Sequence, residues 1–222
     1  MPTAARTGPR VGLLGGSFDP PHLAHLALGQ AAMAQLGLTE LRWLPAGAPW
    51  QKADRLAQMA APEQRLAMLG LLLGDDAAAR GQVIDDRELR RDGATYTIDT
   101  IRELQAERPE VPAEDWLLVL GQDQYARFHT WRDWPELLQR LTLAVAARGG
   151  QPPQPSPELA ALPHRVRHID LPPLDISASD IRRRAATGAA AHSLAPLVGE
   201  AVAGYIARHG LYHSFSHPTA QG

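Results

Sequence analysis

Apolar and polar residues alternate along this chain in blocks that predict strands and helices in turn. Short apolar runs predict buried strands at positions 10–14, 40–46, 81–86, 115–121, 141–147 and 166–172. Apolar residues spaced three and four apart predict helices at positions 22–37, 62–73, 97–107, 177–187 and 194–212. Thr97 and Ser177 are each placed to cap one of these helices, and Gly37 is placed to end the first. Because strands and helices alternate, the expected fold class is α/β, a doubly wound parallel sheet of Rossmann-like type with helices on both faces.

Three segments fall outside this pattern. Positions 1–9 have no apolar periodicity and are expected to form a flexible N-terminus, and positions 214–222 a disordered tail. Positions 149–163 are rich in proline, which is expected to preclude regular structure, so this segment is predicted to be a mobile loop. The remaining span, 10–213, is expected to form a single domain.

Charge and composition narrow the class of protein. The chain has 222 residues and a formal net charge of −2, so no basic field favours nucleic acid as a partner. It has no cysteine, which excludes disulfides, thiolate catalysis and zinc–thiolate sites. No apolar run approaches the length of a membrane span, and the first ten residues lack the apolar core of a signal peptide. We therefore expect a cytoplasmic protein that contacts neither nucleic acid nor a membrane.

The stretch from Val11 to His25, VGLLGGSFDPPHLAH, is the first candidate site. Gly15 and Gly16 follow a predicted strand, where a backbone without side chains can approach a ligand closely. His22 and His25 lie three residues apart, so they share one face of the first turn of the following helix. A helix N-terminus binds phosphate through its unpaired N–H groups and its partial positive charge. Two imidazoles at that position would add directional donors to the same anion.

Other readings of this stretch are less favourable. Histidines three apart on a helix could ligate a metal ion, but no third ligand lies nearby in the sequence and the metalloprotease spacing is absent, so no metal site is predicted. The stretch also lacks the Gly-Lys-Ser/Thr end of a Walker loop and the G-x-G-x-x-G of a dinucleotide-binding turn.

A second candidate motif, ISASDIRRR, lies about 150 residues further along the chain. Its residues Ile176, Ser177, Ser179 and Arg182 place N–H groups, hydroxyls and a guanidinium at another helix N-terminus, which suits the β- and γ-phosphates of a nucleotide. Together the two motifs resemble those of the nucleotidyltransferases that share the HxGH motif. The chain departs from that motif at one position, where Ala24 replaces the family's glycine.

The middle of the chain narrows the resemblance. The segments ELRRDGATYTIDT, GQDQYARFHTWRDW and PHRVRHIDLPPLDISASDIR resemble bacterial nicotinate-nucleotide adenylyltransferases. This resemblance implies a nucleotidyltransferase fold and the joining of ATP and nicotinate mononucleotide into deamido-NAD and pyrophosphate, in NAD biosynthesis. ATP would be the co-substrate, with Mg²⁺ bound through the ATP phosphates.

The same resemblance assigns roles to individual residues. The implied catalytic set is His22, His25, Arg182 and Lys52, the chain's single lysine. The implied ATP-binding set is Gly15, Gly16, Ser17, Phe18, Gly121, Asp123, Ile176, Ser177 and Ser179. The implied acceptor-binding set is Tyr96, Thr97, Ile98, Trp131, Arg132 and Arg148. The indole face of Trp131 suits stacking on the pyridine ring of the acceptor. Backbone amides near Ile98 and Arg132 would hold the nicotinate carboxylate.

Three other functions are weighed against this one. A sister transferase with another phosphorylated acceptor, such as pantetheine phosphate or glycerol phosphate, is disfavoured by the TYTIDT and FHTWRDW segments. A non-catalytic nucleotide-binding regulator is disfavoured because His22, His25 and Arg182 are all present. A fragment of an aminoacyl-tRNA synthetase is disfavoured because no anticodon-binding domain or basic surface is evident. Assembly into a homo-oligomer is left open.

Overall fold

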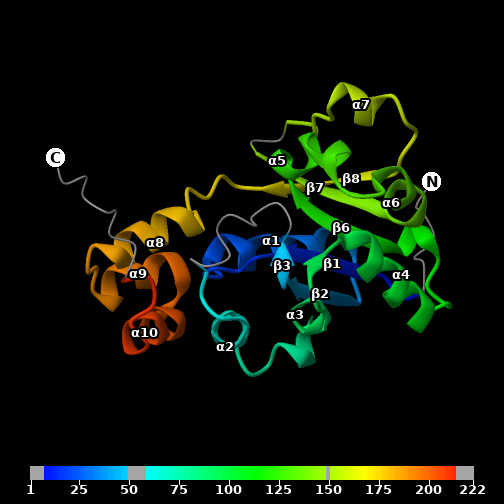
Figure 1. Cartoon of the computed structure of the whole chain (residues 1–222). Helices are drawn as coiled ribbons and strands as arrows, with labels where there is room; N and C mark the ends of the chain where they lie inside the picture. Colours follow the sequence, from blue (N-terminus) through cyan, green and yellow to red (C-terminus); the bar gives the residue numbers. More distant parts are fainter. Residues whose placement is uncertain (1–7, 50–58, 149–150, 214–222) are drawn as a thin grey trace.

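The computed structural model describes residues 8–49, 59–148 and 151–213, and a six-stranded parallel sheet lies at its centre (Figure 1). The strands are β1 (Val11–Gly16), β2 (Glu40–Pro45), β4 (Gln82–Ile84), β6 (Trp116–Gly121), β7 (Thr142–Arg148) and β8 (Val166–Leu171). They lie in the order β4, β2, β1, β6, β7, β8, so all six predicted strands and the predicted doubly wound class are confirmed. From β1 the chain builds outward to β2 and β4 and then crosses back to β6. The topological switch point, where such folds bind ligands, therefore lies between β1 and β6.

Each central strand divides its side chains between two hydrophobic clusters, one on each face of the sheet. In β6, Trp116, Leu118 and Leu120 belong to one cluster, whereas Leu117 and Val119 belong to the other. Successive side chains of a strand point to opposite faces, so a strand buried on both faces becomes a continuous apolar run. This explains why short apolar runs identified the strands.

Helices cover both faces. α4 (Thr97–Glu107) and α6 (Trp134–Arg140) contribute to the cluster that contains Trp116, and α1 (Leu23–Leu36) and α2 (Pro62–Leu73) contribute to the opposite one. α8 (Ala178–Ala186), α9 (Ala191–Val198) and α10 (Glu200–Arg208) form a third cluster with Met68 and Leu72 of α2. Figure 1 shows these three helices grouped beside the sheet, where the chain continues from β8. The short elements are β3 (Ala48–Pro49), α3 (Arg87–Arg90), β5 (Ala94–Thr95), α5 (Gln122–Ala126), α7 (Pro157–Ala160) and 3₁₀ turns at Ala78–Arg80, Ala113–Asp115 and Phe128–Thr130.

Three sequence-based expectations about helix ends and loops were wrong. Thr97 does not cap α4, because the helix begins at Thr97 and Tyr96 occupies the cap position. The predicted helix 194–212 is two helices, α9 and α10, separated by Gly199 at φ 84°. The proline-rich segment contains α7, because the hydroxyl of Ser156 accepts a hydrogen bond from the N–H of Leu159 and the Leu159 side chain is fully buried.

Other boundary expectations held. The hydroxyl of Ser177 accepts from the N–H of Asp180 at 3.2 Å and caps α8. Gly37 ends α1 in the left-handed conformation at φ 62°. The expectations for positions 1–7, 149–150 and 214–222 lie outside the described residues.

Candidate active site

The loop after β1 presents backbone toward the end of the sheet. Gly15 is exposed and Gly16 is half-buried at the carboxyl end of β1, followed by Ser17. Phe18 adopts a positive φ of 46°, and its side chain is only 1% exposed, with its ring 5.1 Å from that of His25. Phe18 therefore belongs to the hydrophobic core, and only its backbone can contact a nucleotide.

The two histidines meet at the start of α1, as predicted. His22 occupies the N-cap position, and its imidazole lies 3.6 Å from that of His25 in a stacked arrangement. The backbone N–H of His22 donates to Nδ1 of His25 at 3.2 Å, so Nε2 of His25 carries the proton. This contact orients the His25 ring.

His22 is buried, and burial determines its charge. His22 is only 7% exposed, and this loss of contact with water lowers its pKa to about 4. His22 is thus neutral near pH 7. Its Nδ1 has no hydrogen-bond partner among the described residues. Buried polar atoms are normally paired, so a ligand group is the expected partner for this imidazole.

Arg182 brings the second motif against the first. Its Nη1 donates to the backbone carbonyl of Asp19 at 2.6 Å and lies 3.8 Å from the Asp19 carboxylate, across 163 positions of sequence. Its Nη2 donates to the hydroxyl of Ser179 at 3.3 Å. The N-termini of α1 and α8 therefore converge on one place. Ile176 is half-buried against the third hydrophobic cluster, so it anchors the start of α8 as well as adjoining the site.

A buried arginine that the sequence reading missed holds the same loop. Arg65 of α2 is 2% exposed and donates from Nη1 to the carbonyls of Ser17 and Ala46, each at 2.8 Å. Its burial lowers its pKa, while the charge of Asp19 raises it. A signal was present in the sequence, because Arg65 lies three and four residues before Met68 and Leu69 on the buried face of α2.

The carboxyl end of β6 faces the same switch point. β6 pairs with β1 in parallel, with Leu13 opposite Leu118, so Gly121 ends its strand beside the β1 loop. Asp123 lies exposed in the first turn of α5. Both residues are therefore at the edge where the predicted nucleotide site lies.

The structure also brings the predicted acceptor residues together. Tyr96 and Trp131 are half-buried against the same hydrophobic cluster, and the guanidinium of Arg132 lies 4.5 Å from the centre of the Tyr96 ring. Thr97 and Ile98 begin α4, where helix geometry provides no intrahelical acceptor for their N–H groups. The Ile98 side chain is fully buried, so only its backbone can contact a ligand.

A short β-bridge connects this acceptor group to the β1 loop. The N–H of Ala46 donates to the carbonyl of Gly16 at 2.9 Å. Two residues later, β3 pairs in parallel with β5, which ends next to Tyr96. Tyr96 and Gly16 thus border the same end of the sheet. Lys52 lies outside the described residues; Arg148 ends β7 opposite Leu171, and only its backbone is described.

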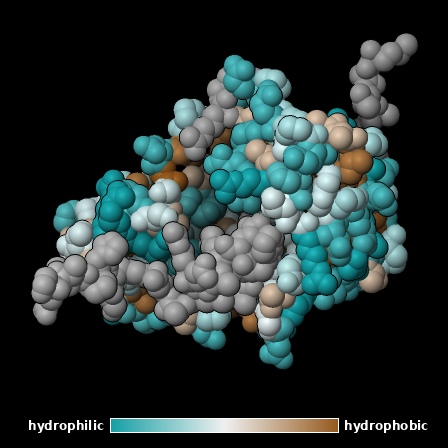
Figure 2. All heavy atoms as spheres, turned by 45° about the horizontal axis from the view of Figure 1, so that its top comes forward, coloured by the Kyte–Doolittle hydropathy of each residue, from teal (hydrophilic) through white to brown (hydrophobic). Residues whose placement is uncertain are grey.

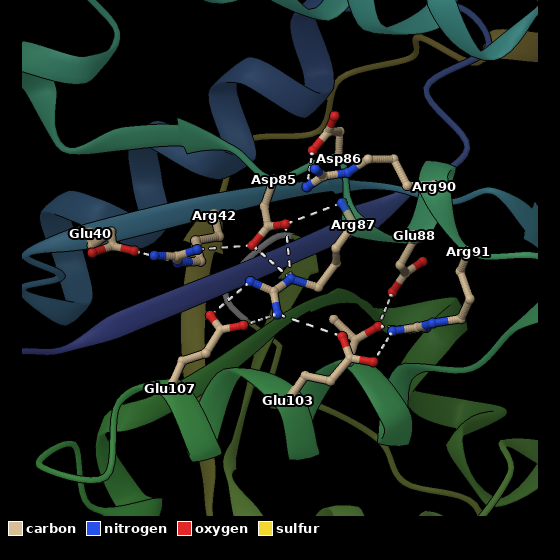
Figure 3. Close-up of polar contacts among 11 residues, drawn as sticks. Glu40, Arg42, Asp85, Asp86, Arg87, Glu88, Arg90, Arg91, Glu103 and Glu107 are labelled. Atoms are coloured by element: carbon tan, nitrogen blue, oxygen red, sulfur yellow. Dashed lines mark hydrogen bonds and ion pairs between the residues drawn. The ribbon is translucent and has the colours of Figure 1, made fainter.

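Ion pairs hold α3 and α4 beside this bridge (Figure 3). Arg87 binds both Asp85 and Glu107, at 2.9 Å in each case. Glu88 is buried and accepts from the hydroxyl of Thr100 at 2.8 Å, and desolvation raises its pKa. A side chain at Gly47 would collide with the carbonyl of Glu88, so the two segments are in direct contact. These contacts position the first turn of α4.

The surface around these groups suits a small polar ligand. In Figure 2 the surface is hollowed between α8–α10, on the left, and the body that carries the sheet, and the visible face is mostly hydrophilic. Within the described ranges, no cluster of three or more histidine, aspartate or glutamate residues could hold a metal ion. No described helix is long and apolar enough to cross a membrane.

Comparisons with known proteins agree with this arrangement. A family model described as cytidylyltransferase-like matches residues 13–184. A protein of Methylibium petroleiphilum named as a probable nicotinate-nucleotide adenylyltransferase is 46% identical over 204 residues, covering 91% of this chain and 92% of the relative. A Bordetella petrii protein with the same name is 48% identical over 207 residues, covering 91% of this chain and 98% of the relative.

Solved structures match the fold. Nicotinic acid mononucleotide adenylyltransferase of Plasmodium falciparum, solved in complex with NaAD, superposes with a TM-score of 0.76 at 17% identity, covering 93% of this chain and 98% of that one. The two motifs converge near the switch point, and the chain matches these relatives over more than nine tenths of their length. It belongs to the nicotinate-nucleotide adenylyltransferases within the cytidylyltransferase-like family.

Proposed function

We propose that this protein joins ATP and nicotinate mononucleotide to form deamido-NAD and pyrophosphate, a step of NAD biosynthesis. The observation that carries the proposal is the contact between Arg182 and Asp19, because it brings together the N-termini of α1 and α8, and a helix N-terminus suits phosphate binding. The relatives' shared name supports the choice of reaction. The acceptor group around Tyr96 borders the same end of the sheet.

The reaction needs alignment more than activation of a nucleophile. An oxygen of the acceptor phosphate, already anionic near pH 7, forms a bond to the α-phosphorus of ATP. The bond between the α-phosphorus and the oxygen that bridges to the β-phosphorus breaks, and pyrophosphate leaves with that electron pair. Atoms and charge balance without a covalent enzyme intermediate. Catalysis then consists of positioning the reactants and neutralising charge as it moves.

The described residues suit distinct parts of this transfer. His22 and His25 would donate hydrogen bonds to the α-phosphate from the start of α1. Arg182, Ser177 and Ser179 would bind the departing pyrophosphate from the start of α8. Mg²⁺ would enter with ATP, held by its phosphates. Lys52 and Arg148 remain proposed phosphate and cleft residues on sequence grounds alone.

Acceptor selectivity would arise at the start of α4. The N–H groups of Thr97 and Ile98 point out of the first turn and can donate to a carboxylate, as can an amide near Arg132. A carboxamide would present an NH₂ group where these donors need an acceptor. The Nε1–H of Trp131 is buried without a partner among the described residues, so this ring too has a polar group available to a ligand.

A single assay tests the function and the acceptor choice. The protein is incubated with ATP, Mg²⁺ and either nicotinate or nicotinamide mononucleotide, and the products are identified by mass spectrometry. We expect deamido-NAD and pyrophosphate, with a higher specificity constant for nicotinate mononucleotide. Absence of any dinucleotide would refute adenylyl transfer. Equal specificity constants would refute the carboxylate site, and product from pantetheine phosphate instead would identify a sister transferase.

Replacing Trp131 by alanine is expected to weaken acceptor binding by roughly 1–3 kcal/mol, the scale of stacking between a base and an aromatic side chain. The acceptor KM should rise while the ATP KM changes little. Trp134→Ala is the control, because Trp134 is a half-buried tryptophan of the same hydrophobic cluster with no proposed ligand contact. A rise in the ATP KM of Trp131→Ala, or equal acceptor effects in both variants, would contradict the stacking assignment.

A further inference from the structure

Tyr212, near the C-terminus, contacts the loop of the first motif, between β1 and α1, at the residue that also contacts Arg182. Its hydroxyl donates to Oδ1 of Asp19 at 2.8 Å, across 193 positions of sequence. Asp19 is 3% exposed and Tyr212 is 6% exposed, so the contact is inside the protein. Burial and the nearby charge of Asp19 raise the pKa of Tyr212, which keeps the hydroxyl protonated as a donor. No part of the proposed chemistry uses this residue.

Asp19 lies between Tyr212 and Arg182. Its Oδ1 accepts from Tyr212 and from the N–H of Ala60 at 3.1 Å. Its Oδ2 lies 3.8 Å from Nη1 of Arg182, and its backbone carbonyl accepts from that same nitrogen at 2.6 Å. The carboxylate therefore makes only a long ion pair with Arg182, whose guanidinium contacts the backbone carbonyl of Asp19 more closely than the negative charge.

The backbone on both sides of this contact is constrained. Tyr212 adopts φ 70° and Phe18, immediately before Asp19, adopts φ 46°. A residue other than glycine is uncommon in this region, and such conformations persist where the surroundings hold them. The N–H of Leu211 donates to the carbonyl of Ile206 at 3.0 Å and turns the chain back after α10, which places the Tyr212 ring against the loop. One partner of this hydrogen bond, Tyr212, and the residue next to the other partner, Phe18, thus both have a positive φ.

We propose that Tyr212 is a positioning residue for adenylyl transfer, which keeps the ion pair between Asp19 and Arg182 long, at 3.8 Å, so that the guanidinium charge stays available to the leaving pyrophosphate. This inference rests on the proposed function. Without the Tyr212 hydroxyl, the Asp19 carboxylate loses one of the two Oδ1 donors found among the described residues and can rotate into closer contact with Arg182. A closer ion pair would neutralise the guanidinium and draw it out of the site.

The experiment compares Tyr212→Phe with Tyr205→Phe. Tyr205 lies on α10 with its ring 4.1 Å from that of His209, so the control removes the same hydroxyl from the same C-terminal unit. For Tyr212→Phe we expect kcat to fall about tenfold, the scale of one hydrogen bond to a charged group. The acceptor KM should stay within about twofold of the wild type, as should both constants of Tyr205→Phe. All assays are run well below the melting temperature of each variant.

A double-mutant cycle separates positioning from a merely structural role. In an Arg182→Met background, Tyr212→Phe should cause no further loss of kcat, because the hydroxyl acts through the missing guanidinium. Replacing Tyr212 by 4-aminophenylalanine, which keeps a donor on the ring, should restore turnover. A tenfold loss that persists in the Arg182→Met background, or a Tyr212→Phe kcat within twofold of the wild type, would overturn the inference. If the wild type itself forms no dinucleotide, the proposed function fails before this comparison begins.

Discussion

Replacing His22 by alanine is expected to lower turnover by roughly 10²–10³-fold, the usual cost of removing one preorganised donor to a developing charge. The imidazole is fixed by stacking on His25 and by its N-cap position, so it needs no reorganisation when charge shifts across the α-phosphate. His22→Asn should be less impaired, because the amide keeps an N–H donor with a shorter reach. ATP binding should weaken less than turnover in both variants. His168→Ala, which removes an exposed histidine from β8, should remain within about twofold of the wild type.

The pH dependence of stability tests the burial of His22 on which this expectation depends. The pKa of His22 is about 4 in the folded protein and 6.5 for an unburied histidine, so as the pH falls the unfolded chain binds the proton first. Its contribution to stability is therefore present above pH 6.5 and is lost as the pH falls through about 4. Unfolding by urea between these pH values should show a steeper loss for the wild type than for His22→Asn.

Elemental analysis of the same proteins addresses the metal alternative. If His22 and His25 ligated a transition metal, the wild type would carry it and each variant would lose it. We expect no bound transition metal in any of them. Near-normal turnover of a folded, metal-free His22→Ala would eliminate the phosphate-donor role.

The sheet was predictable because its strands obey a simple rule. A parallel strand buried on both faces, such as β6 or β7, must be apolar at nearly every position, so it stands out in the sequence as a short continuous apolar run. The helix ends were less predictable. Gly199 adopts φ 84° and divides α9 from α10, yet glycines are also tolerated inside helices, and the pattern of apolar residues continues across it. Leu159 was missed because prolines dominate its segment, although one apolar side chain can anchor a loop.

The motifs of the site could be predicted from the sequence, but the contacts that hold those motifs together could not. The glycines, histidines and Ser177 follow from local chemistry at strand and helix ends, which a sequence displays directly. The contacts of Asp19 with Arg182 and Tyr212 join residues 163 and 193 positions apart, and no local pattern specifies such pairs. Arg65 was predictable only in part. The helical period places it on the buried face of α2, but it does not reveal which carbonyls the side chain binds.

The second large effect is expected at Arg182. Replacing it by methionine keeps an unbranched apolar stem and removes the guanidinium with its charge, and we expect kcat to fall about 10³-fold, the lower end of what an arginine contributes to phosphoryl transfer. The ATP KM should change much less, because most of the charge develops on the bridging oxygen as pyrophosphate departs. Arg182→Lys should be intermediate, since an ammonium supplies the charge without the planar pair of donors that reaches Asp19 and Ser179 together.

Arg183→Met provides the matched control for this prediction. Arg183 is the next residue of α8, its side chain is 74% exposed, and its partner is Asp180 on the same helix. The two substitutions remove one positive charge each from adjacent positions, so a general effect of charge on the surface would lower turnover in both. A role confined to the site predicts a loss in Arg182→Met and a kcat within about twofold of the wild type in Arg183→Met. Equal losses would place the effect in the electrostatic field of α8, and an Arg182→Met enzyme that turns over within a few-fold of the wild type would remove Arg182 from the reaction.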